Sequence, residues 1–184
     1  MRETSLAVVS TQALIMEDPR KFPLLLQRRC KGVALVDIFE AKCPSLRKLG
    51  EEYGVEHVKL RVKALLLWIN EIANLNRGLN PFVIESIADK LVDTYPYYNL
   101  TLEDLNIVLM DGVSGKYSKD GIVLVLNMSI LMSWIDKYFD KRSEEAWQWN
   151  KNKDGYHPCG VGQRSSKETL VGFIVKQRER EKNG

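Results

Sequence analysis

The chain has 184 residues, of which 45% are hydrophobic and 28% are charged, which is typical of one globular core with a small appendage. The longest apolar run, residues 64–69, is too short to cross a bilayer, and the first residues lack the pattern of a signal peptide. We therefore expect a cytoplasmic protein without membrane contact. Three cysteines without regular spacing argue against a disulfide framework.

The formal net charge of +3 is too small to indicate a nucleic-acid-binding protein, but its distribution is uneven. Residues 151–184 carry eight basic and four acidic side chains, which leaves residues 1–150 close to neutral. A second cluster of cations lies between Pro19 and Lys31. We expect a helical core domain over residues 1–150, followed by a basic loop and a C-terminal helix over residues 151–184.

The first third of the chain predicts short helices. Apolar residues at helical spacing favour a helix over Glu3–Met16, and Pro23 is placed to open the next one. The segment Val33–Ala41 is compatible with a strand or a helix. Ser45 can cap a further short helix that ends at Gly54.

The longest helical pattern runs from Val55 to Arg77, and we expect it to be the central helix of the core. Its apolar positions recur every three or four residues, and neighbouring ones widen the stripe almost all round the helix, as in helices that are buried on several sides. The recurring positions are Val58, Val62, Leu65, Ile69, Ile72 and Ala73.

Three further helices have recognisable start signals. Asn80 followed by proline predicts one N-terminus. Thr101 and Asp104 form a capping-box pattern for a helix that we expect to end at Gly112, and Glu103 and Asp104 suit the positive end of its dipole. Asn127 predicts the cap of a helix reaching about Trp149. Residues 121–126 read as a short strand or an extended connection.

The C-terminal region predicts one more helix, which Ser165 and Glu168 would cap. Its apolar stripe is narrow and consists of Leu170, Phe173 and Ile174. The expected fold class is therefore an all-α, or nearly all-α, compact bundle of helices with a basic C-terminal helix.

The motifs that suggest chemistry are weak. The segment from Gly112 to Ser118 has two residues before Gly-Lys, where a phosphate-binding loop needs four, and Tyr117 stands where that loop needs a hydroxyl ligand for magnesium. The cysteines and histidines lack the paired knuckles of a zinc site. We expect no catalytic residues, no metal and no cofactor.

Trp147 and Trp149 precede two lysines, a pattern that can stack on bases and grip phosphates. Packing of both tryptophans against the helical core is the favoured interpretation, because buried aromatic side chains stabilise cores.

A set of short motifs between Ser45 and Arg142 resembles a family of Bacteroidetes proteins that has no established activity. The motifs are Trp68-Ile-Asn, Leu79-Asn80, Ile87-Ala88, Leu100-Thr-Leu-Glu-Asp-Leu, Gly115-Lys-Tyr, Trp134-Ile, and Tyr138 with Arg142. Members of this family, a domain of unknown function, are often carried on phage-like or conjugative elements. The resemblance implies a role in the replication or maintenance of mobile DNA, with a replication protein such as a helicase as a partner.

We therefore expect a non-enzymatic accessory protein that acts through protein contacts and through contacts with DNA. The candidate phosphate contacts are Arg28, Arg29, Lys116, Lys119, Arg164, Lys167, Arg178 and Arg180. The alternative is a helical adaptor or inhibitor that binds a protein partner without nucleic acid. Its candidate surface is the stripe of Leu170, Phe173 and Ile174.

Overall fold

The computed structural model describes residues 11–73, 75–118, 120–121, 123 and 125–153, and most of these are helical, as the apolar periodicity predicts. The first helices are α1 (Thr11–Met16), α2 (Phe22–Cys30), α3 (Leu35–Glu40), α4 (Leu46–Tyr53) and α5 (Val55–Ile72). They are followed by α6 (Pro81–Asp93), the 3-10 helix η2 (Tyr97–Asn99), α7 (Leu102–Val113) and α8 (Met128–Lys153). The region 33–41, compatible with strand or helix from its sequence, thus contains α3. The predicted C-terminal helix lies outside the described residues.

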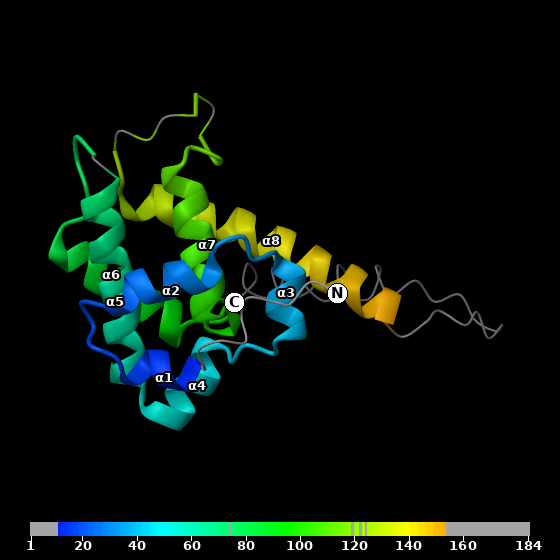
Figure 1. Ribbon diagram of the computed structural model, residues 1–184. Coiled ribbons are helices and arrows are strands. Elements are labelled where there is room, and N and C mark those ends of the chain that lie inside the picture. Colours follow the sequence, from blue (N-terminus) through cyan, green and yellow to red (C-terminus); the bar gives the residue numbers. More distant parts are fainter. Residues whose placement is uncertain (1–10, 74, 119, 122, 124, 154–184) are drawn as a thin grey trace, which may run out of the picture. The chain divides into compact units, whose positions relative to one another are not determined.

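Helix α5 is the centre of the bundle, as its sequence predicts. It packs against α1, α2, α4, α6 and α7, and Figure 1 shows α2 lying across α5 and α7. Leu65 and Ile69 are fully buried on α5, whereas Leu67 is half exposed, so the apolar stripe does not cover the whole circumference. The helix therefore contributes two faces to the core. One lies between α4 and α6, and the other lies toward α2 and α7.

Helix α5 ends at Ile72, five residues before the predicted end at Arg77. Asn70 holds the chain that follows, because its Oδ1 accepts a hydrogen bond from the N–H of Leu79 (2.7 Å) and its Nδ2 donates one to the carbonyl of Leu79 (3.2 Å). Gly78 passes so close that an added Cβ would lie 2.0 Å from Asn70 Oδ1. The chain after α5 thus folds back on the helix it has just left.

The predicted start signals are confirmed where the structure describes them. Ser45, Asn80, Thr101 and Asn127 each accept a hydrogen bond from the backbone N–H three residues later, at 2.8 to 3.3 Å. The start of α7 is also tied to the start of α4, because the N–H of Leu46 donates to the carbonyl of Leu100 (2.8 Å). Local capping chemistry therefore fixes where four of the helices begin.

Helix α7 ends at Val113, one residue beyond the predicted end at Gly112. Gly112 faces the indole of Trp134 on α8, and a Cβ there would lie 2.1 Å from Trp134 Cε3. The glycine therefore allows α7 and α8 to approach closely rather than ending the helix.

The segment before α8 is an extended connection in its described residues. The N–H of Leu126 donates to the carbonyl of Arg77 (2.9 Å), and Val125 forms an isolated parallel bridge with Arg77. Helix α8 then runs to Lys153, beyond the predicted end at Trp149, with Leu131, Ile135 and Tyr138 buried.

Candidate functional site

The first turn of α7 carries a buried carboxylate, Asp104, that joins α7 to α8. Its Oδ2 accepts hydrogen bonds from the N–H (2.8 Å) and the hydroxyl (3.0 Å) of Thr101, and from Nε of Arg142 (2.8 Å). Its Oδ1 accepts a hydrogen bond from the Tyr138 hydroxyl (2.7 Å). The carboxylate therefore completes the capping box and holds two side chains of α8.

The neighbouring carboxylate, Glu103, joins α7 to α2. Glu103 Oε1 lies 3.3 Å from Nη2 of Arg29, and the two side chains are 0% and 8% exposed. Burial raises the pKa of Glu103, and the positive charge of Arg29 lowers it again in part. Both acids occupy the helix N-terminus, as expected from the sequence, but their complete burial was not predicted.

These contacts mean that the two buried carboxylates and the arginines paired with them stabilise the packing of the helices. Helices α2, α7 and α8 meet at the first turn of α7 through one ion pair to Arg29 and one to Arg142. A further buried cation, Arg61 of α5, donates to the carbonyl of Ile15 and lies over the ring of Phe22 (5.4 Å). Sequence periodicity missed Arg61 because it stands on the apolar face of α5, where its alkyl stem can pack.

Cys30 and Cys43 lie close to the Arg29–Glu103 pair. Arg29 Nη2 is 3.9 Å from the sulfur of Cys43. Burial is the main cause that raises the pKa of Cys30 to about 12 and that of Cys43 to about 11, and the charge of Glu103 adds to both shifts. Both thiols therefore stay protonated at neutral pH, which does not suit a nucleophile.

We expect these two thiols to resist alkylation in the folded protein. At pH 8 the raised pKa values should slow the reaction of Cys30 and Cys43 with iodoacetamide by about a hundredfold or more relative to the unfolded chain. Peptide mass spectrometry would give the rate for each cysteine, with the guanidinium-unfolded chain as the control. The rates should rise as the pH is raised toward 11, and equal rates for folded and unfolded protein at pH 8 would refute the assignment.

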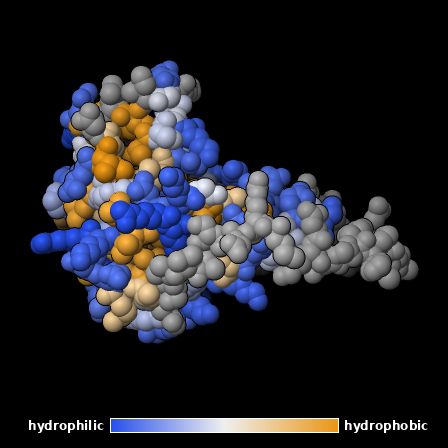
Figure 2. Space-filling view, in the orientation of Figure 1, coloured by the Kyte–Doolittle hydropathy of each residue, from blue (hydrophilic) through white to orange (hydrophobic). Residues whose placement is uncertain are grey.

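A pocket of about 530 Å³ opens between α2, the turn after it, and α7. Its apolar walls include Leu24, Val33, Ile107 and Met110, and its cationic members are Arg28 and Lys31. Figure 2 shows hydrophobic surface next to strongly hydrophilic residues in the region of α2. An apolar hollow bordered by two exposed cations is suited to bind an apolar group that carries negative charge beside it.

The floor of this α2–α7 pocket contains Asn106, a polar residue that is only 3% exposed. Its carboxamide hydrogen-bonds the Cys30 side chain, while its Oδ1 has no hydrogen-bond partner. Asn106 belongs to none of the predicted sites. The signal that could have identified it is a polar residue between two apolar ones, Leu105 and Ile107, on a helix whose other apolar positions form the core.

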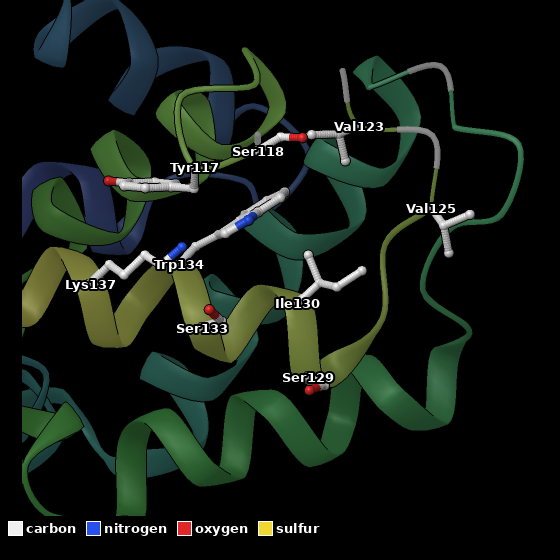
Figure 3. Close-up of a pocket in the computed structure, with 9 residues that line it drawn as sticks. All are labelled: Tyr117, Ser118, Val123, Val125, Ser129, Ile130, Ser133, Trp134 and Lys137. Atoms are coloured by element: carbon white, nitrogen blue, oxygen red, sulfur yellow. The ribbon is translucent and has the colours of Figure 1, made fainter. Parts of the chain in front are cut away.

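A second pocket, of about 420 Å³, lies beside the start of α8 (Figure 3). The ring of Tyr117 faces that of Trp134, with centroids 6.3 Å apart and planes tilted by 31°. Ser133 and Lys137 of α8 line the same hollow. Trp134 is itself buried against Gly112, so this aromatic pair mainly closes the seam between α7 and α8.

Three of the candidate phosphate contacts lie in the described part of the chain. Arg28 is exposed at the α2–α7 pocket, Arg29 is buried against Glu103, and Lys116 is ion-paired with Asp111. The remaining candidates fall outside the described residues, as do the three apolar residues of the candidate partner surface. They are Lys119, Arg164, Lys167, Arg178 and Arg180, with Leu170, Phe173 and Ile174.

The two tryptophans near the end of α8 differ in their exposure. Trp149 packs against Phe39 of α3 at a centroid distance of 5.9 Å, as expected for a core-closing residue. Trp147 is half exposed. The packing interpretation therefore holds for Trp149.

Three further findings bear on the kind of site. Among the described residues, no group of three or more acidic, histidine or cysteine side chains is arranged to hold a metal ion. In the same part of the chain, no helix combines the length and apolar character needed to span a membrane. Comparisons with protein-family models, with curated proteins and with solved structures find no match to this chain.

Proposed function

We propose that this chain is a non-enzymatic accessory protein that binds a protein partner through the α2–α7 pocket. The observation that carries the proposal is the combination in that pocket of an apolar hollow, two exposed cations and a buried amide. The family resemblance supplies the biological setting, which is the replication or maintenance of mobile DNA. A replication protein such as a helicase is a partner that fits this setting.

The use of the other polar side chains supports a binding role. Glu103 and Asp104, the paired acids that would otherwise suggest acid–base chemistry, each have an ion-pair partner and lie inside the core. The two described cysteines have raised pKa values. These groups stabilise the packing of α2, α7 and α8, and the side chains left at the surface of α2 are suited to contact a partner.

Contact with a protein is favoured over contact with DNA by the described cations. A DNA-binding face needs several cations that are free to reach successive phosphates. Among the described candidates, Arg29 is buried against Glu103 and Lys116 is paired with Asp111, while Arg28 lies with Lys31 at the α2–α7 pocket.

The experiment selects binders from a displayed library of random twelve-residue peptides against the full chain. The test variant is Arg28→Gln with Lys31→Gln, and the matched control is Lys48→Gln with Arg77→Gln, which removes the same charge from exposed positions outside the pocket. Peptides bound by the wild type should lose at least about tenfold in affinity for the test variant and stay within about twofold for the control.

The wild type, the test variant and the control variant are then compared in a gel shift with random duplex and single-stranded DNA at two salt concentrations. The proposal fails if the selected peptides bind the test variant as well as the wild type. It also fails if the wild type binds DNA at low salt and the test variant does not, because Arg28 and Lys31 would then contact phosphates.

A further inference from the structure

The carboxamide of Asn106 is a buried polar group that lines the otherwise apolar part of the α2–α7 pocket. It is 3% exposed, and its Oδ1 lacks a hydrogen-bond partner, although a buried acceptor without a donor costs free energy. On α7 its wall neighbours Ile107 and Met110 have no side-chain donor, and the lining residues that do have one, among them Gln27 and Cys30, leave this oxygen without a partner. A ligand that brings a donor to this oxygen would remove that cost.

The charges around the pocket indicate which charge the ligand carries beside the group that enters the pocket. Arg28 and Lys31 are exposed members of the pocket. Asp111, its acidic member, is already ion-paired with Lys116. The pocket therefore presents a net positive border to a segment that carries carboxylates.

We propose that the α2–α7 pocket binds a tryptophan or tyrosine side chain from an acidic segment of the partner. The indole N–H or the phenol O–H donates to Asn106 Oδ1, the ring packs on the apolar walls, and flanking carboxylates pair with Arg28 and Lys31. This inference rests on the proposed function and adds to it the residue type that the partner inserts.

Other side chains satisfy only part of this environment. Phenylalanine and leucine would cover the walls but leave the amide oxygen without a donor, whereas serine and threonine would supply a donor and leave most of the hollow empty. A lysine would bring its charge against the two cations. Tryptophan and tyrosine combine an apolar body with a donor at the tip, and both are common as anchors of interfaces.

The ring reaches the oxygen by moving Met110. Asn106 Oδ1 is shielded from solvent, and Met110 follows it by one turn on the same face of α7. Methionine adapts its three rotatable bonds to a new neighbour at little cost, and this residue is only partly buried. The opening therefore requires a side-chain movement without a change in the helices.

The experiment measures the affinity of fluorescent nine-residue peptides for the full chain. Each peptide has four acidic residues around a central tryptophan, tyrosine, phenylalanine, leucine or 1-methyltryptophan. Tryptophan and tyrosine should bind about tenfold or more tightly than phenylalanine, and 1-methyltryptophan should lose the same factor because its indole cannot donate. The 1-methyltryptophan peptide tests the hydrogen bond on the unaltered protein.

The variant Asn106→Leu completes a double-mutant cycle with these peptides, once circular dichroism has shown that the variant folds. It should reduce the difference between tryptophan and phenylalanine to less than about threefold. If tryptophan, 1-methyltryptophan and phenylalanine bind the wild type equally and still depend on Arg28 and Lys31, the inference is wrong and the proposed function stands. If none of the peptides binds and the displayed library yields no binder, both are wrong.

Discussion

Replacing Asp104 with alanine should destabilise the protein by about 4 kcal/mol, because it leaves several buried groups without their acceptor. The Tyr138 hydroxyl, Nε of Arg142 and the N–H of Thr101 all donate to this carboxylate at 2.7 to 2.8 Å. The variant also removes the negative charge from the positive end of the α7 dipole. Urea unfolding followed by circular dichroism measures the change.

The matched control for this variant is Asp140→Ala. Asp140 is also an aspartate of a core helix, but its side chain is exposed on α8. Its removal should therefore change stability by no more than about 0.5 kcal/mol. A loss below about 1 kcal/mol for Asp104→Ala would mean that the contacts at the first turn of α7 do not hold α8 in place.

Replacing Arg29 with methionine should have the second large effect, and that effect should depend on pH. Methionine fills most of the space but leaves Glu103 without the ion pair that offsets its burial, at a cost of about 3–5 kcal/mol at neutral pH. Burial already raises the folded-state pKa of Glu103 above its ordinary value of 4.5, and loss of Arg29 raises it further.

The sign of the pH dependence follows from this raised pKa. Above pH 4.5 the unfolded chain releases the Glu103 proton while the folded variant keeps it, so the stability of the variant falls as the pH rises through the folded-state pKa. The loss relative to wild type should therefore be smaller at pH 5 than at pH 8. Urea unfolding at these two pH values measures it.

The double variant Arg29→Met with Glu103→Met separates the ion pair from simple packing. With no buried charge left, it should recover most of the stability lost in the single variant and lose the added pH dependence. A single variant whose cost is the same at pH 5 and pH 8, or a double variant as unstable as the single one, would contradict the role assigned to this pair.

The helix starts were predictable because they depend on residues close in sequence. Ser45, Asn80, Thr101 and Asn127 cap helices through side chains that bond a backbone group three residues away. The central position of α5 also followed from its own pattern, since an apolar stripe wide enough for several partners indicates burial on several sides. These predictions needed no knowledge of the tertiary fold.

The features that sequence reasoning missed depend on residues far apart in the chain. Glu103 is buried because Arg29 reaches it from α2, and Asp104 because Arg142 reaches it from α8. Gly112 lies inside α7 rather than at its end, and the indole of Trp134 from α8 packs against it. Local propensity contains none of these partners, so it indicated only a helix-dipole role for the two acids and a helix end at the glycine.

The same limit applies to the candidate site. The exposed cation Arg28 was predicted as a contact residue, but nothing in the spacing indicated that Asn106, almost eighty positions later, would lie in the same pocket. Arg29, its neighbour in sequence, was grouped with it although the two side chains point to different environments. Adjacent residues on a helix are turned by about 100°, which separates a surface cation from a buried one.

The claim that the α2–α7 pocket is the binding surface is tested most directly by a nitrogen-15 NMR titration of the full chain with the tryptophan peptide. We predict that the largest shifts occur at the backbone of Arg28, Lys31 and Met110 and at the side-chain amide of Asn106. Shifts concentrated instead around Tyr117 and Trp134, or no shifts at saturating peptide, would contradict it.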